Sequence, residues 1–492
     1  MIFWLALLIC STGIAGLFFL DRDPSTRNSK ALWLPVIWLW IAGSRAVSSW
    51  FGIRSGSAGA LASTLDGSPI DAAIYAILMA AGIIVLFLRR DRAVVLLKKN
   101  GPILIYLLYC LISITWSSIP EPAFKRWTKD VGDVVMALVL VTDGHPIEAL
   151  RRLYSRVGFI LLPFSIFLIR YTDLGRAFTP DGEPMNTGVT TNKNALGLIV
   201  YLVLLGAVWN VRALLRDKEI PNRNRRLIAQ GSLLTFGLVL LQMAHCATAV
   251  ACFVLGGGLM LTTSLRAIRN RPARVHALCL AILLGGALTM SLGGQSIVTS
   301  ALGRKENMGR ADIWKAAIAA AGNPVIGTGF ESFWNTSVHK VARGLPGYWD
   351  MNDLATAHDG YIEVYLNLGW VGVCLIAVIL ISGYRRAGEV FRRDPEFGSL
   401  ILAYVVTAAF YSITESGFRV LTPSWIFLLL AVVSASGFVS GLFGNEAREI
   451  LDWRGGTASK TVASNRLVPA GAVYTARRGP TKFGITRANN PH

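Results

Sequence analysis

Apolar runs of roughly twenty residues, separated by shorter polar segments, extend along most of the chain. An α-helix of about 20 apolar residues is long enough to cross the roughly 30 Å hydrocarbon core of a bilayer. The pattern therefore predicts an all-α fold, a polytopic membrane helical bundle of about 12–13 transmembrane helices with one large outward loop. The predicted spans are residues 2–20, 31–50, 71–88, 101–117, 131–142, 156–171, 194–214, 228–243, 246–264, 275–292, 361–382, 398–415 and 421–444.

Composition agrees with this prediction and excludes a typical soluble globule. The chain of 492 residues is 53% hydrophobic and 16% charged, whereas about a quarter of the residues in a soluble domain are charged. The first apolar run has no basic segment before it and no small-residue cleavage site after it, so we expect a retained helix. The six cysteines lie in apolar runs without zinc-type spacing, which predicts small buried side chains.

The formal net charge of +19 is distributed in blocks and does not indicate a nucleic-acid partner. Basic-rich polar segments alternate with basic-poor ones, as expected when the basic segments face the cytoplasm. This alternation predicts an amino terminus outside, a carboxyl-terminal tail inside and the large loop outside. The basic segments also offer a surface for anionic lipid head groups. They are residues 89–99, 212–226, 266–274, 384–393 and the tail after residue 444.

Three regions follow from this division of the chain. Residues 1–190 are predicted to be N-terminal transmembrane helices. Residues 191–444 form a second membrane region, which includes the large outward loop at residues 293–360. Residues 445–492 are polar, basic and rich in Gly, Thr and Pro, which predicts a disordered cytoplasmic tail.

The large loop carries the strongest candidates for chemistry. Arg304 and Arg310 lie near its start and His358 at its end. A helix start is predicted directly after His358, at Asp359, so the histidine is expected where water meets the membrane. There a histidine can take a proton from a sugar hydroxyl near neutral pH, and Tyr361 could stack on a sugar ring. The alternative is a half-exposed histidine that only caps a helix.

Basic residues on the predicted outer side run against the orientation bias, so each requires a reason. A guanidinium group can donate two parallel hydrogen bonds to the oxygens of one phosphate. Binding of the diphosphate of a lipid carrier would therefore explain basic residues on the outer side. The alternative for any one of these residues is that its charged end snorkels to the membrane interface. The candidates are Lys125, Arg126, Arg170, Lys193 with the adjacent Asn194, Arg304 and Arg310.

Four acidic residues lie at or within predicted span ends, where a charge costs a few kcal/mol unless it is paired. We expect them to form ion pairs with the basic residues above. No D-x-D pair or other carboxylate pair occurs on the outer loops, which argues against a divalent-metal site, and no cofactor is predicted. The four residues are Asp130, Asp133, Glu363 and Glu415.

Three motifs in and around the large loop together resemble the O-antigen ligase/polymerase family, and within it the bacterial exopolysaccharide-production polymerases. They are GRKENMGRADIW at Gly303–Trp314, NPVIGTGF at Asn323–Phe330 and AHDGYIEVYLNLGWVG at Ala357–Gly372. The segment TNKNALG at residues 191–197 resembles the family's K-N-x-x-G element at the start of a span. Lys125-Arg126-Trp127 and Thr414-Glu415-Ser416 also resemble that subgroup.

The resemblance implies a metal-independent membrane glycosyltransferase that uses a lipid-diphosphate-sugar donor. Family members carry a large periplasmic loop with a histidine and arginines needed for activity. These match His358 and Arg310, which are the predicted catalytic residues. Asp359 stands where ligases more often have Asn or Ser, and this departure argues against a ligase. The predicted substrate-binding residues are Arg304, Lys125, Arg126, Arg170, Lys193, Asn194, Tyr361 and Glu415.

The implied function is a polymerase that joins undecaprenyl-diphosphate-linked oligosaccharide repeats into exopolysaccharide or O-antigen at the periplasmic face of the bacterial inner membrane. Its partners would be this donor, membrane lipids, and polysaccharide chain-length and export proteins. A ligase that moves finished polysaccharide to a lipid acceptor would use the same site. Two other classes stay open. A flippase or transporter of lipid-linked sugars would need a continuous polar path through the spans, and a scaffold for an export complex would make His358 dispensable.

Overall fold

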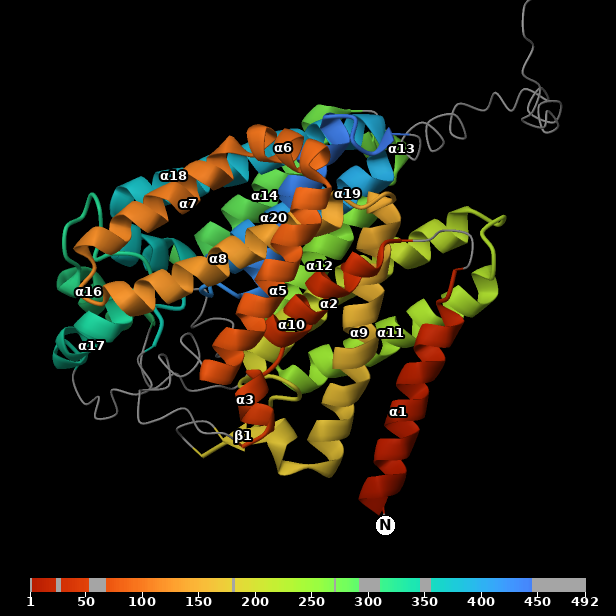
Figure 1. Cartoon of the computed structure of the whole chain (residues 1–492), viewed down its shortest axis with the longest axis horizontal. Helices are drawn as coiled ribbons and strands as arrows, with labels where there is room; N and C mark the ends of the chain where they lie inside the picture. Colours follow the sequence, from red (N-terminus) through yellow and green to blue (C-terminus); the bar gives the residue numbers. More distant parts are fainter. Residues whose placement is uncertain are drawn as a thin grey trace, which may run out of the picture.

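The computed structural model describes residues 2–23, 28–52, 68–178, 182–269, 271–291, 310–345 and 355–444. Within these residues the chain is almost entirely helical, with one antiparallel pair of short strands, β1 (Arg176–Phe178) and β2 (Pro184–Asn186) (Figure 1). The predicted all-α helical bundle is confirmed. Arg304 and the predicted disordered tail at residues 445–492 lie outside the described residues.

Each predicted apolar run contains a helix. The helices are α1 (Ile2–Leu20), α2 (Trp33–Ala42), α3 (Val47–Trp50), α5 (Pro69–Leu88), α6 (Arg90–Lys99), α7 (Gly101–Ser113), α8 (Pro120–Val141), α9 (Pro146–Tyr171), α10 (Lys193–Arg216), α11 (Arg223–Ala244), α12 (Ala247–Thr262), α13 (Arg266–Arg269), α14 (Pro272–Ser291), α16 (Arg310–Ala320), α17 (Phe333–Arg343), α18 (Gly360–Arg393), α19 (Pro395–Tyr411) and α20 (Pro423–Val439). The 3-10 turns are η1 (Lys30–Leu32), η2 (Ile114–Trp116) and η3 (Asp173–Gly175). However, α8 and α9 begin about ten residues before their predicted spans, and α6, α16 and α17 lie outside all of the predicted spans.

In the described part of the chain, fewer helices are long enough to cross a membrane than the sequence predicts. Six pass by length and composition, namely α1, α5, α9, α10, α11 and α18, and a seventh span arises if α6 and α7, bent by 81°, are counted as one. The apolar helices α12, α19 and α20 have only 10–17 residues. The predicted span at 31–50 is divided into α2 and α3, because the turn at Gly43 and Ser44 interrupts it. An apolar run therefore shows that a helix forms but not where it ends.

The bundle has a buried centre and a loosely packed edge. All but one of the 17 residues of α20 are buried, and α20 packs against α8, α18 and α19. In α1, by contrast, only Leu17 is buried, and this helix stands at the edge of the bundle against α9 and α11 (Figure 1). At the opposite end of the view, α16 and α17 lie beside the ends of the tilted helices α7, α8 and α18 (Figure 1).

Helix α18 is broken at Gly369, where φ is +62° and ψ is −165°. The break frees backbone groups on both sides, and the loop before α17 satisfies them. Gly329 N donates to Asn367 O at 2.8 Å, and Trp370 N donates to Pro324 O at 2.9 Å. An unpaired backbone group in an apolar surrounding costs several kcal/mol, so these bonds hold the loop and the helix together.

Two side chains complete this junction. The Tyr109 hydroxyl on α7 donates to the Leu368 carbonyl at 3.0 Å. The Asn367 side-chain oxygen accepts from the backbone N–H groups of Ser332 and Phe333 at 2.8 and 3.0 Å, and so fixes the start of α17. The first half of α18 and the helix α17 are thereby one structural unit.

We predict that Gly369→Ala destabilises the protein by about 3 kcal/mol or more. The left-handed conformation is strained for alanine, and a Cβ there would lie 2.2 Å from the carbonyl carbon and oxygen of Val325. The matched control is Gly388→Ala in the second half of α18, where no atom lies within 4 Å of the new Cβ. The control is expected to gain about 0.5–1 kcal/mol. Thermal unfolding of the detergent-solubilised variants measures both, and equal midpoints for the two would contradict the role given to the break.

Candidate functional site

Five chain segments that are far apart in the sequence meet at one point of the structure. They are the starts of α10, α12, α16 and α18, and the connection between α19 and α20. Four of the five are helix N-terminal ends, where unpaired N–H groups and the helix dipole favour anions. The side chains contributed are Asn194 from α10, Thr248 from α12, Arg310 from α16, His358 from the residues before α18, and Thr414 and Glu415 from the connection.

The Glu415 carboxylate lies at the centre of this cluster. Its Oε1 accepts hydrogen bonds from Arg310 Nη2 at 3.3 Å and from Asn194 Nδ2 at 3.1 Å. Its Oε2 lies 3.1 Å from His358 Nδ1. The Glu415 side chain is 8% exposed, whereas the side chains of Arg310 and His358 are 24% and 38% exposed. The cationic Arg310 and the titratable His358 therefore both bond one buried carboxylate and remain partly exposed.

Lys193 directly precedes Asn194 in the first turn of α10, so its backbone lies next to this cluster. Cys246 is the residue directly before α12. Gly197, in the first turns of α10, lets α10 and α12 approach closely, because a Cβ on it would lie 2.8 Å from the Cβ of Cys246. Gly197, the last residue of the segment TNKNALG, therefore allows the start of α10 to pack against the residues before α12.

The backbone around His358 is held from both sides. His358 itself has φ +52°. Asp359 caps α18 by accepting from two backbone N–H groups of its first turn, at 2.8 and 2.9 Å. Gly360 N donates to Ser412 O at 2.7 Å, and a Cβ on Gly360 would lie 2.9 Å from the Ser412 Cβ. The helix start therefore rests directly on the α19–α20 connection.

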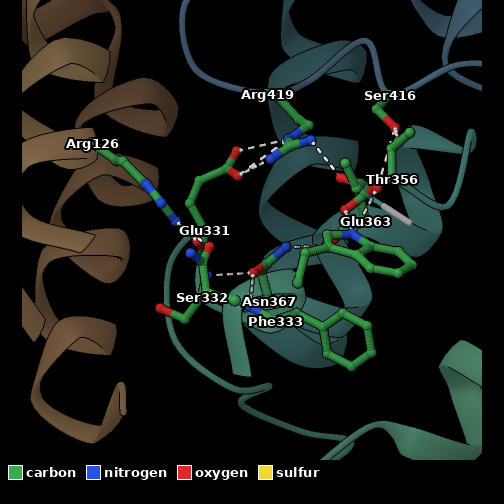
Figure 2. Close-up of polar contacts among 12 residues, drawn as sticks. Arg126, Glu331, Ser332, Phe333, Thr356, Glu363, Asn367, Ser416 and Arg419 are labelled. Carbon is green, nitrogen blue, oxygen red and sulfur yellow. Dashed lines mark hydrogen bonds and ion pairs between the residues drawn. The ribbon is translucent and has the colours of Figure 1, made fainter. Parts of the chain in front are cut away.

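The buried Glu363 carboxylate, in the first turn of α18, accepts hydrogen bonds from three neutral donors (Figure 2). Trp334 Nε1 donates to both of its oxygens at 2.9 and 3.0 Å, Ala357 N donates at 2.6 Å and Ser416 Oγ at 3.3 Å. Thr356 links to the same group, since its hydroxyl bonds Ser416 Oγ and accepts from the N–H of the histidine at 3.1 Å. Glu363 therefore joins α17, the residues before α18 and the α19–α20 connection.

A second buried carboxylate, Glu331, forms an ion pair with Arg419 (Figure 2). Arg419 Nη2 and Nε lie 2.8 and 3.1 Å from Glu331 Oε2, and Arg419 Nη1 donates to the Ala355 carbonyl at 3.2 Å. The Glu331 carbonyl accepts from Arg126 Nη1, and Arg126 also donates to Asn335 Oδ1 at 3.0 Å. This ion pair connects α8, the start of α17 and the residues before His358 to one another.

The structure brings four of the predicted site residues into direct contact, namely Arg310, His358, Asn194 and Glu415, with Lys193 beside them. The predicted ion pair of Glu415 with a basic residue is confirmed. These residues come from widely separated parts of the sequence, and together they are the candidate site.

The other predicted binding residues lie elsewhere. Arg126 is fully buried, and its guanidinium donates to the Glu331 carbonyl and to Asn335 Oδ1. Lys125 is exposed and bonds Glu121 one turn earlier at 2.7 Å. Arg170 is exposed at the end of α9. The hydroxyl of Tyr361 donates to the Ala409 carbonyl at 3.1 Å and its ring packs edge-on against Phe418, so this ring is largely engaged inside the bundle.

The remaining acidic residues have indole partners that the sequence did not indicate. Trp425 Nε1 donates to Asp130 Oδ1, and Trp38 Nε1 donates to Asp133 Oδ1, each at 2.7 Å. Arg419 is not among the residues predicted from the sequence, although it lies between the predicted spans 398–415 and 421–444 and is a basic residue like the other candidates. Among the described residues, no group of three or more His, Cys, Asp or Glu side chains is arranged to hold a metal ion.

The family model described as O-antigen ligase matches residues 230–377, which confirms the resemblance found in the sequence. The matched range includes Arg310, Glu363 and His358, and it does not include Asn194 or Glu415. No curated protein matches the chain. The match and the apolar helices together support a multi-pass membrane enzyme of the ligase or polymerase type.

We predict that Asp359→Asn raises stability at neutral pH. Burial raises the pKa of Asp359 to about 6, despite the two N–H donors of α18 that lower it. Because the folded pKa lies above the ordinary value, the charged carboxylate opposes folding above about pH 6, and this cost disappears as the pH falls toward 4. Asparagine caps a helix as well as aspartate does but carries no charge.

The expected gain is about 2–3 kcal/mol at pH 7 and near zero at pH 4. Unfolding midpoints between pH 4 and pH 7.5 measure it. The control is Asp394→Asn at the start of α19, where the side chain caps the helix in the same way. A loss of stability at pH 7 in the Asp359 variant would show that its charge supports the fold.

Proposed function

Because residues 230–377 match the O-antigen ligase family, we propose that the protein is a polysaccharide polymerase. It joins undecaprenyl-diphosphate-linked oligosaccharide repeats at the periplasmic face of the bacterial inner membrane. The observation that carries the proposal is the contact of Arg310 and His358 with one buried carboxylate, at a point where four helix N-termini meet.

His358 is assigned to the acceptor. A carboxylate at Nδ1 favours the tautomer with the proton on that nitrogen, which leaves Nε2 with a free lone pair. With its side chain 38% exposed, the imidazole can reach a sugar hydroxyl. His358 removes or orients the hydroxyl proton as the acceptor oxygen attacks, and general-base catalysis of this kind contributes about 10²–10⁴-fold.

Arg310 is assigned to the donor. Its guanidinium, held by the Thr414 carbonyl at 2.5 Å, is fixed at the N-terminus of α16 close to Lys193 and Asn194 on α10. The acceptor oxygen forms a bond to the anomeric carbon, and the bond from that carbon to the diphosphate breaks. The diphosphate leaves with the electron pair, and fixed cations stabilise its charge without a metal ion.

The other predicted substrate-binding residues have secondary roles in this proposal. Arg304 remains a candidate for a second guanidinium on the diphosphate. Lys125 and Arg170 are exposed on the predicted outer side and would attract the anionic donor. Arg126 supports the site through Glu331 and would not bind phosphate in its buried position.

A ligase that transfers finished polysaccharide to a lipid acceptor is the second candidate, because the same residues would serve it. A flippase or transporter of lipid-linked sugars is the rival from another class. Such a protein would move the donor without consuming it, and its transport would not require the contact between Glu415 and His358.

We predict that His358→Ala and Arg310→Ala each lower polymer formation by about 100-fold or more. The measurement complements cells that lack the protein with each variant and sizes their surface polysaccharide and lipid-linked oligosaccharides. The matched controls are His339→Ala and Arg343→Ala on α17, both exposed in the same loop region, which should behave as wild type. Full rescue by both site variants would refute the proposal.

The sizes of the surface polysaccharide and of the lipid-linked oligosaccharides also distinguish the candidate functions. A polymerase defect leaves single repeats on the lipid carrier, because no repeat is joined to another. A ligase defect leaves long polymer on the carrier. If repeats accumulate on the cytoplasmic side only, the protein is a transporter and the assigned roles of His358 and Arg310 are wrong.

A further inference from the structure

We propose that Glu415 couples donor binding to the activation of His358, so that the base is fully engaged only when the diphosphate is bound. This inference rests on the proposed function of the site. It makes Glu415 a positioning residue whose carboxylate is the partner of Arg310 and Asn194 until the donor's phosphate groups bind them instead.

The two oxygens of Glu415 have different partners. Oε1 accepts from Arg310 and Asn194, which are the assigned donor-side groups, and Oε2 accepts from His358, the acceptor-side group. One oxygen of the carboxylate therefore interacts with the residues assigned to the donor, and the other interacts with the residue assigned to the acceptor. An anion that binds Arg310 and Asn194 removes two hydrogen bonds from the Glu415 carboxylate. The hydrogen bond between this carboxylate and His358 then becomes stronger.

A diphosphate is suited to take over these groups. Phosphate oxygens bind guanidinium in pairs and carry more charge than a single carboxylate. Arg310 can change partner without moving far, because its Nη1 is anchored on the Thr414 carbonyl. Arg310 and His358 are both more exposed than Glu415, so an incoming ligand meets them first.

Glu415 itself stays in place during such an exchange. Its backbone N–H donates to Tyr411 O at 2.9 Å, and the next residue, Ser416, is held by Glu363. Once Arg310 and Asn194 bind the diphosphate, the Glu415 carboxylate keeps its hydrogen bond with His358 Nδ1. A stronger bond at Nδ1 makes Nε2 a better proton acceptor.

The coupling predicts two effects of opposite direction in one variant. In Glu415→Gln, turnover of the lipid-diphosphate donor falls by about 100-fold, since the neutral amide polarises His358 poorly. In the same variant, undecaprenyl diphosphate without sugar binds about tenfold more tightly, because no internal charge competes for Arg310. A residue that merely supports the fold, or one that binds the donor directly, would weaken binding.

The experiment uses the full chain in nanodiscs, with turnover and binding of undecaprenyl diphosphate measured on the same samples. Glu415→Asp retains the charge on a shorter side chain that cannot span both groups, and is expected to lose turnover with less gain in binding. Glu363→Gln is the comparator for loss of positioning alone and should lose turnover without tighter binding. Asp173→Asn, an exposed carboxylate in η3, should match wild type in both.

The outcomes separate this inference from the function on which it rests. Weaker or unchanged binding in Glu415→Gln, with wild-type turnover that depends on His358, overturns the coupling and leaves the enzyme intact. Unchanged turnover in Glu415→Gln does the same. If wild type does not turn over the donor at all, or His358→Ala is fully active, the proposed function itself falls.

Discussion

A broken helix in apolar surroundings must have its backbone groups satisfied by something else, and this constraint organises the site end of the protein. At Gly369 the two halves of α18 part, and the loop from Pro324 to Gly329 supplies the missing partners. The loop is therefore fixed to the helix by main-chain bonds that hardly depend on side-chain identity. Its glycines are required because backbone approaches backbone there: a Cβ on Gly327 would lie 2.4 Å from the Asn367 carbonyl.

Two buried carboxylates then transmit this rigidity to the histidine. Glu331 follows the loop and pairs with Arg419, while Glu363, inside the short half-helix, binds the residue before His358. Removing one partner of such a buried pair leaves an uncompensated charge, which costs about 3–5 kcal/mol. The residues before His358 are therefore held by the Glu331–Arg419 ion pair and by the neutral donors that bond Glu363.

The sequence predicted the helical class, the position of most of the apolar helices and the groups that carry charge at the site. Glu415 and His358 could be selected because charged and titratable residues at span ends are few and require a reason. Arg310 could be selected because it is a basic residue in an outward loop and matches the family's motif. What could not be selected was their pairing. Glu415 is separated from His358 by 57 positions and from Asn194 by 221, and no local pattern shows which distant ends meet. The ends of apolar helices and the inward turn of Tyr361 were likewise decided by tertiary packing, which a single sequence does not reveal.

The position of Glu415 and Arg419 between the last two helices has a consequence for biosynthesis. A ribosome delivers the residues of α10, α16 and α18 to the membrane well before it delivers the connection after α19. Until that connection is in place, Arg310 and His358 have no carboxylate between them and the Glu331 carboxylate lacks its partner Arg419. A nascent or truncated chain that stops before residue 415 therefore holds most of the bundle but no site. The final helical hairpin is therefore the last part of the chain to reach the site, and the site can form only after that hairpin has packed into the bundle.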